Sequence, residues 1–453
     1  FRRKVTESPF FYSVTLKPLK MIKDSEVLEP QYLPNIFTMG RFTTLGDIEP
    51  TFQRFQLPVN VGTFKGMKGN VPCKFDLHEL QYSHTGIFAK TKSGKTYLAK
   101  VICSYIVRAA KRAVLIFDMH QEYGFSPSGL RQIFEEDELL VFSVDSRSKT
   151  DETIRIPYST ISVDDLILCL GDELSPAMVD ALYEAESVFG TQWFGAFART
   201  SSDPEERNMI ADDLVIRLGG NRDERGNVRE GPVKRGTIQV LRRKIGILAR
   251  YEFIVPEEDV DSIRKMIENL KKGRSVVLDF GRYSRNPRVY VLVSNLLTKS
   301  LFESCSSVPE EEREKIPMIS VLVEEAHRFL GTEARKRNTV FPVLAREGRK
   351  YRLGIIVIDQ KPSQIDEEVI SQLHTQIFLR LTSDEDIQKI RKASEEDISD
   401  YIPEIKRLNV GEALAVGEAV TFPSSFKVMH FDISEFKKRF PPKGKKSAIY
   451  FEG

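Results

Sequence analysis

The chain has 453 residues, 41% of them apolar and 29% charged, and its 67 lysines and arginines nearly balance 65 aspartates and glutamates. This length predicts a main α/β domain with one or two smaller attachments; the composition excludes a disordered chain, and a net charge of +2 neither indicates nor excludes nucleic-acid binding. No apolar run approaches the roughly 20 residues that cross a bilayer and no secretory segment opens the chain, so we expect a cytoplasmic protein with no membrane association.

Residues 1–70 place prolines and glycines between short apolar runs, which predicts a small β-rich N-terminal module, a reduced or incomplete barrel. Residues 71–160 contain an apolar run at Thr85–Ala89, a polar turn, a helical repeat of apolar residues over Leu98–Ala109, and a buried-strand pattern at Ala113–Asp118. The order strand, helix, strand makes a βαβ unit and implies a parallel sheet, so this segment predicts the first part of an α/β core.

Residues 161–273 carry helical patterns with no strong strand between them, which predicts a helical insertion. The predicted helices are Asp164–Leu170, Ala177–Phe189, Glu205–Leu218, Thr237–Ala249 and Val260–Lys272. The second part of the core is expected over 274–435, followed by a C-terminal tail at 436–453. Its predicted strands are Ser275–Phe280, Met318–Glu324, Gly354–Asp359, Gln376–Leu381 and Glu412–Val416.

A Gly-Lys-Thr turn follows the first predicted core strand and opens a helix, so its N–H groups and the positive end of the helix dipole converge on a phosphate. Lys95 can reach the β- and γ-phosphates of ATP, and the Thr96 hydroxyl can ligate magnesium. The alternative is a polar turn that caps a helix, and Ala89 stands where the eight-residue pattern has its first glycine. The predicted nucleotide-binding residues of this loop are Lys90, Thr91, Lys92, Ser93, Gly94, Lys95 and Thr96.

The strand Met318–Glu324 ends in two adjacent acids at the sheet edge where ligands bind. A P-loop enzyme needs one acid for the metal and often a second for the attacking water, so we assign Glu324 to magnesium and Glu325 to water. The alternative is an acidic strand end that faces solvent.

Two further polar residues end predicted strands. Asp118 is expected either near the nucleotide pocket or as a helix-capping aspartate, with neither favoured. Gln360 is placed to sense the γ-phosphate or to orient water, whereas a lone residue of this kind is more often a loop polar group.

Arg346 and Arg349 belong to a basic cluster and are three residues apart, hence on one face of a helix that extends so far. Solvated surface is the ordinary role of such a cluster. An arginine that stabilises transition-state charge from a neighbouring subunit needs this kind of exposed position. The basic run at 335–337 is a further candidate for DNA contact or for solvated surface.

Six segments occur in order along the chain: Ser93-Gly94-Lys95-Thr96, Phe117-Asp118-x-His120-x-Glu122-Tyr123, Glu324-Glu325-Ala326-His327, Ala345-Arg346-Glu347-Gly348-Arg349-Lys350, Gln360-Lys361-Pro362-Ser363 and Val410-Gly411-Glu412-Ala413. In this order they resemble HerA-type ATPases, which are RecA-like motor proteins related to the FtsK translocases. The resemblance runs from about Val61 to about Phe431, most of the chain, and the Arg-Glu-Gly-Arg-Lys block is far more specific than the P-loop.

The resemblance implies a homohexameric ring that hydrolyses ATP at its subunit interfaces and pumps double-stranded DNA through its central channel. It also implies a RecA-like P-loop core with a mainly parallel sheet, a helical-bundle insertion, and an N-terminal β-barrel on which a NurA-like nuclease docks. Motif matching makes Arg346 or Arg349 the arginine finger of the neighbouring subunit. The residues that it assigns to the site of their own subunit are Lys95, Thr96, Glu324, Glu325 and Gln360.

We therefore predict an ATP-driven double-stranded DNA translocase that acts with a nuclease in DNA end processing. Two departures from the family pattern support an alternative: Lys92 stands where the family usually has glycine, and Asp359 where it often has serine. Both could slow turnover, so the alternative is an ATP-binding ring scaffold that activates a nuclease or an NAD-consuming effector in phage defence. A conjugative-type or packaging DNA pump and a small-molecule P-loop kinase are weaker alternatives.

Overall fold

The computed structural model describes residues 43–441, apart from 68, 200, 202, 257–260, 332–338 and 395–396, together with the short strands β1 (Met21–Lys23) and β2 (Glu26–Leu28). Most of the predicted N-terminal module, the basic run at 335–337 and most of the predicted tail therefore lie outside the described residues. Within the described part, no helix combines the length and the hydropathy that a bilayer crossing requires.

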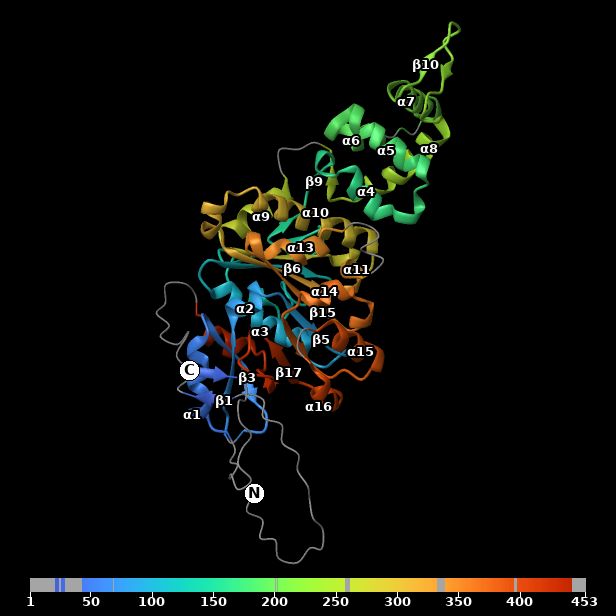
Figure 1. Ribbon diagram of the computed structural model, residues 1–453. Helices are drawn as coiled ribbons and strands as arrows, with labels where there is room; N and C mark the ends of the chain where they lie inside the picture. Colours follow the sequence, from blue (N-terminus) through green and yellow to red (C-terminus); the bar gives the residue numbers. More distant parts are fainter. Residues whose placement is uncertain are drawn as a thin grey trace, which may run out of the picture.

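A twelve-stranded sheet forms the centre of the molecule (Figure 1). Seven successive neighbour pairs, from β16 to β8, are parallel, whereas β17, β18, β3 and β4 add an antiparallel edge. The predicted α/β fold with a mainly parallel sheet is confirmed. Across the sheet the strands are β4 (Pro72–Asp76), β3 (Pro58–Phe64), β18 (Ser424–Val428), β17 (Glu412–Gly417), β16 (Thr375–Phe378), β5 (Thr85–Phe88), β15 (Leu353–Asp359), β14 (Met318–Glu324), β6 (Arg112–Asp118), β13 (Ser275–Asp279), β7 (Leu139–Ser143) and β8 (Glu152–Thr153).

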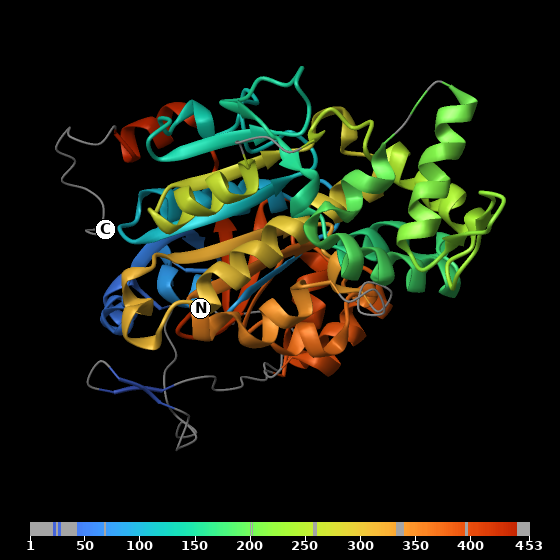
Figure 2. The same ribbon diagram turned by 90° about the horizontal axis from the view of Figure 1, so that it is seen from above.

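The central strands are buried on both faces, which explains their continuous apolar runs. Alternate residues of β6 join different cores: Leu115 and Phe117 belong to one apolar cluster, and Val114 and Ile116 to the other. Helix α3 (Lys95–Arg108) packs in the second cluster, and α9 (Ser262–Lys271) and α10 (Pro287–Ser306) in the first. Helices thus cover both faces of the sheet (Figure 2).

The remaining helices near the sheet are short. They are α1 (Leu45–Ile48), α2 (Leu77–Tyr82), α11 (His327–Leu330), α13 (Phe341–Glu347), α14 (Glu367–Ser371), α15 (Asp384–Ala393), α16 (Ile402–Arg407) and α17 (Ile433–Arg439). Helix α1 precedes the first strand of the sheet, α17 follows the last, and the others connect its strands.

Helices α5–α8 project from one end of the sheet domain (Figure 1). The sequence patterns do not predict α6. A hairpin of two-residue strands, β10 and β11, lies between α7 and α8. Helix α9 contacts β13, β6 and α10, so it packs on the sheet; the division of the chain at 161 and 273 stays a prediction. The elements of this region are β9 (Ile156–Pro157), α4 (Val163–Leu170), α5 (Pro176–Phe189), α6 (Trp193–Ala198), α7 (Pro204–Arg217), β10 (Asn221–Arg222), β11 (Val228–Arg229), α8 (Arg235–Leu248) and β12 (Ile254–Val255).

The sheet order brings distant chain segments to one edge. Strands β5, β15, β14 and β6 are consecutive neighbours, and in register Asp359 pairs with Phe88, Glu324 with Ile358, and Val323 with Phe117. The carboxyl ends of these four strands therefore lie side by side. In an open α/β sheet this edge is where ligands bind.

Candidate nucleotide-binding site

The phosphate loop joins the end of β5 to the first turn of α3. Two of its residues have left-handed backbone: Lys92 with φ +63° and Gly94 with φ +106°. A residue with a Cβ carries about 1 kcal/mol of strain in this conformation. Lys92 adopts it at a position where the family usually has glycine. The Ser93 hydroxyl donates to the Lys90 carbonyl at 2.6 Å, which closes the turn. The N-terminus of α3 follows this turn directly, as an anion site requires.

Backbone hydrogen bonds hold this loop to three other segments. The Lys90 N–H donates to the Arg380 carbonyl at 3.0 Å and the Ala89 N–H to the Asp359 carbonyl at 3.1 Å. The Gly411 N–H donates to the Ser93 carbonyl at 3.0 Å. Gly411 belongs to the Val-Gly-Glu-Ala segment of the resemblance, so this segment is hydrogen-bonded to the phosphate loop.

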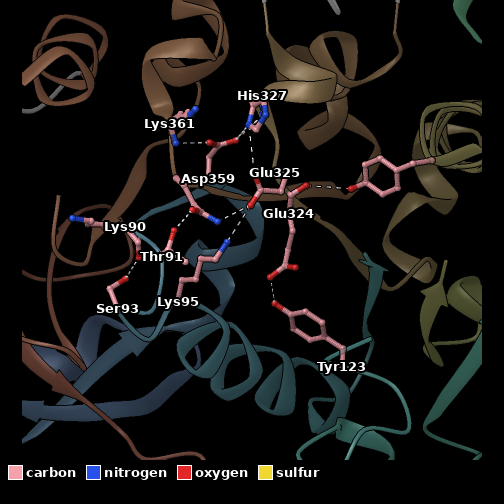
Figure 3. A network of polar contacts seen from close by, with 12 residues as sticks. Lys90, Thr91, Ser93, Lys95, Tyr123, Glu324, Glu325, His327, Asp359 and Lys361 are labelled. Carbon is pink, nitrogen blue, oxygen red and sulfur yellow. Dashed lines mark hydrogen bonds and ion pairs between the residues drawn. The ribbon is translucent and has the colours of Figure 1, made fainter. Parts of the chain in front are cut away.

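Glu325 lies at the centre of a polar network (Figure 3). Its Oε1 accepts from Lys95 Nζ at 3.4 Å and from Gln360 Nε2 at 2.8 Å, and the Gln360 amide oxygen accepts in turn from the Thr91 hydroxyl. The structure thus brings together four predicted site residues from three loops. Glu325 also has left-handed backbone, φ +49°, and its side chain points away from that of Glu324 (Figure 3).

Glu324 is fully buried at the end of β14. Its Oε1 accepts from the Tyr123 hydroxyl at 2.9 Å, whereas its Oε2 has no hydrogen-bond partner among the described residues. Burial raises the pKa of Glu324 to about 7, against the lowering effects of Lys95 and of the Tyr123 hydrogen bond. A buried carboxylate oxygen without a partner is costly unless a cation or proton satisfies it. This donor set, an anionic oxygen beside a phosphate loop that carries the Thr96 hydroxyl, fits magnesium.

Asp118 caps the turn that follows β6; no helix begins at that turn, so it is not the helix cap that the sequence offered as one of its two roles. Its carboxylate accepts from the backbone N–H groups of Glu122 at 2.8 Å, Tyr123 at 2.8 Å and Gly124 at 3.1 Å. Burial nevertheless raises its pKa to about 6. Both oxygens are therefore engaged in capping a turn, and the assignment of Asp118 to the nucleotide stays a prediction.

Asp359 does not point at the presumed phosphate sensor. Its Oδ2 accepts from the His327 backbone N–H at 2.7 Å and lies 3.0 Å from His327 Nδ1, and its Oδ1 accepts from the Lys361 N–H at 2.7 Å. The carboxylate that departs from the family pattern thus joins the loops after β14 and β15.

Arg346 and Arg349 lie in the segment that leads into the amino end of β15. Arg346 is 45% exposed and pairs with Glu368 at 3.1 Å. Arg349 approaches His84, at the amino end of β5, where burial first and then Arg349 lower the pKa of His84 to about 3. The seven residues of β15 span about 20 Å. Arg349 therefore lies near the amino end of β15, at the opposite end of this strand from Gln360.

Tyr123, His327 and Gly411 contact the site although no role was predicted for them. Each belongs to a segment that carries the resemblance, and that membership was the available signal. Their partners were not predictable from spacing: Tyr123 and Glu324, for example, are 201 positions apart.

The sheet order, the loop and the paired acids define a P-loop ATPase with a RecA-like core. Residues 59–301 match the family model described as "Helicase HerA, central domain", and residues 214–429 match the model "Helicase HerA-like C-terminal". The chain belongs to the HerA helicase family.

Relatives of known name agree with this assignment. The chain is 25% identical to the "DNA double-strand break repair helicase HerA" of Pyrococcus furiosus, over 82% of this chain and 70% of that protein. It is also 25% identical to the protein of the same name from Sulfolobus acidocaldarius, over 94% of this chain and 79% of that one.

Solved structures share the fold. The bacterial conjugative coupling protein TrwB superposes with a TM-score of 0.54 at 13% identity, over 87% of this chain and 94% of that one. VirB4 of Thermoanaerobacter pseudethanolicus gives a TM-score of 0.52 at 14% identity, over 83% of this chain and 97% of that one. At this identity the likeness concerns the fold alone.

Proposed function

We propose that the protein is an ATP-driven double-stranded DNA translocase that works as a hexameric ring and acts with a nuclease in DNA end processing. The HerA relatives, named as double-strand break repair helicases, support the DNA substrate and the repair setting. The observation that carries the ring is the placement of Arg349 at the opposite end of β15 from Gln360. An arginine in that position serves catalysis at the site of a neighbouring copy.

Within one subunit, Lys95 and the loop N–H groups bind the phosphates of ATP. Thr96 and Glu324 hold magnesium, which neutralises charge that develops on the phosphoryl oxygens. Lys95 pairs with Glu325 in the present structure, and a triphosphate competes for the same ammonium group. Binding of ATP therefore frees Glu325 to accept a proton from water, while the Gln360 amide orients that water.

The neighbouring subunit completes the site with Arg349 or Arg346, whose positive charge stabilises the transition state. Arg346 is exposed and its ion pair with Glu368 is a surface pair worth under about 1 kcal/mol, so this pair does little to oppose its release toward a neighbour.

The test is ATP hydrolysis by the purified protein with and without linear duplex DNA. We expect DNA to stimulate hydrolysis and Lys95→Ala to abolish it. A mixture of Lys95→Ala and Arg349→Ala subunits should recover part of the activity, because some interfaces then combine an intact loop with an intact arginine; Arg346→Ala is tested in the same way. Absence of DNA-stimulated hydrolysis in the wild type contradicts the motor, and a monomeric mass in the presence of ATP contradicts the ring.

The second candidate is the ring scaffold that activates a nuclease or an NAD-consuming effector. Lys92 in left-handed backbone favours it, because a strained loop residue suits slow turnover. Asp359 favours it less than the sequence suggested, since its carboxylate is engaged with His327 and Lys361. Effector activity that persists with Glu325→Gln, in the presence of ATP but without hydrolysis, distinguishes the scaffold from the motor.

A further inference from the structure

The turn after β6 places Tyr123 against Glu324, the acid that we assign to magnesium. Asp118 ends β6 and its two carboxylate oxygens accept three backbone N–H groups, those of Glu122, Tyr123 and Gly124. Gln121 completes the turn in left-handed backbone, φ +56°. Since a carboxylate that accepts several N–H groups makes charge-assisted hydrogen bonds, the course of the chain from Asp118 to Tyr123 is firmly determined.

Tyr123 itself is fully buried and its ring cannot swing freely. The ammonium of Lys100, on α3, lies 5.8 Å from the ring centroid, and the side chain has no exposed surface. Its hydroxyl donates to Glu324 Oε1 at 2.9 Å. The bond crosses from the turn after β6 to the end of the neighbouring strand β14 (Figure 3).

One oxygen of Glu324 is thereby held and the other is left open. Oε1 receives the Tyr123 hydroxyl, and Oε2 is buried without a partner. A carboxylate with one oxygen fixed by a neutral donor has a set rotation about its terminal bond, so the second oxygen keeps a constant direction. This is how donors behind a metal ligand orient it.

We infer that Tyr123 is a positioning residue for the magnesium ligand Glu324, and that Asp118 serves the same purpose by building the turn. The inference rests on the proposed ATPase site. It gives the Phe117–Tyr123 segment a role at the metal.

Tyr290 provides a matched control. It is also a fully buried tyrosine, and its hydroxyl also bonds Glu324, but at the backbone carbonyl, 3.2 Å away. Tyr290→Phe therefore removes the same group from the same residue without touching the carboxylate. An effect on metal binding shared by both variants would come from packing.

The experiment measures Mn²⁺ binding by the full-length protein with saturating ADP, using electron paramagnetic resonance of the free ion. We expect Tyr123→Phe to raise the Mn²⁺ dissociation constant about 10-fold or more, and Tyr290→Phe to leave it within about twofold. ADP affinity without metal and the melting temperature should be alike in both variants. Asp118→Asn, which weakens the turn, is expected to raise the Mn²⁺ dissociation constant in the same direction and serves if Tyr123→Phe does not fold.

Wild-type-like Mn²⁺ affinity in Tyr123→Phe, or equal losses in Tyr123→Phe and Tyr290→Phe, overturns the inference alone. A wild type that binds no Mn²⁺ with ADP overturns the proposed ATPase site, and the inference with it.

Discussion

Lys95 Nζ lies 3.4 Å from Glu325 Oε1, although 230 positions separate the two residues. The cation that binds phosphate and the carboxylate assigned to water therefore neutralise each other before nucleotide arrives. Because one ammonium group cannot serve both partners equally, occupancy of the phosphate loop and release of the base are linked.

Glu325→Gln should lower kcat for ATP hydrolysis by about 10²- to 10⁴-fold, the usual contribution of a general base. The amide cannot accept a proton from water but retains the size of the side chain, so ATP should bind as well as before or better. Steady-state hydrolysis and equilibrium binding of a fluorescent ATP analogue measure the two effects. Glu367→Gln, which changes an exposed glutamate paired with Lys389, should change neither.

Replacement of Lys92 tests the left-handed backbone of the phosphate loop. Lys92→Gly should leave the free energy of unfolding within about 1 kcal/mol of the wild type, since glycine adopts φ +63° without strain but adds freedom to the unfolded chain. Lys92→Val should destabilise by about 1–2 kcal/mol, because a β-branched residue tolerates this region poorly. Urea unfolding followed by circular dichroism measures both. Equal stability of the two variants would contradict the assigned backbone.

Alanine substitutions of Arg346 and Arg349 should differ in their effects on catalysis. Alanine at the arginine that acts as the finger should lower kcat by about 10³-fold or more, with little change in ATP affinity. Arg346→Ala should change stability by less than about 1 kcal/mol, since it loses one exposed ion pair. Single-turnover hydrolysis in the assembled state identifies the finger; normal rates in both variants would exclude a trans role for either.

His84 predicts a pH dependence of stability. Burial, and next Arg349, lower its pKa to about 3 in the folded protein, against about 6.5 when unfolded. Below pH 6.5 the His84 imidazole binds a proton in the unfolded chain but stays neutral in the folded protein. Its contribution to the free energy of unfolding therefore falls as pH decreases. Between pH 7 and 5 the loss is about 2 kcal/mol.

His84→Asn isolates this effect, because asparagine tolerates the left-handed φ of +53° and can accept the Ile355 N–H that bonds His84 Nδ1 at 3.2 Å. The difference in unfolding free energy between wild type and variant should shrink by about 2 kcal/mol from pH 7 to pH 5. Glu324, whose pKa is raised, acts in the opposite direction in this range but is the same in both proteins. A pH-independent difference would show that His84 does not titrate as stated.

Part of the fold could be predicted from the sequence alone. The strands β5, β6, β13, β14 and β15 were predicted within one residue at each end, because strands buried on both faces are continuous apolar runs. The predicted strands did not include β3, β4 and β18 at the antiparallel edge, where burial alternates and the signal is weaker. They also omitted β7.

The sequence by itself determined the P-loop, the paired acids and the family, because each rests on adjacent residues whose chemistry is local. Only the tertiary structure showed that Asp118 caps the turn after β6, that Tyr123 bonds Glu324, and that Lys95 faces Glu325. It also placed Arg349 across the sheet from the loop that its chain carries. These relationships depend on the order of strands in the sheet, and strand order is set by the packing of the whole core, which no local pattern encodes.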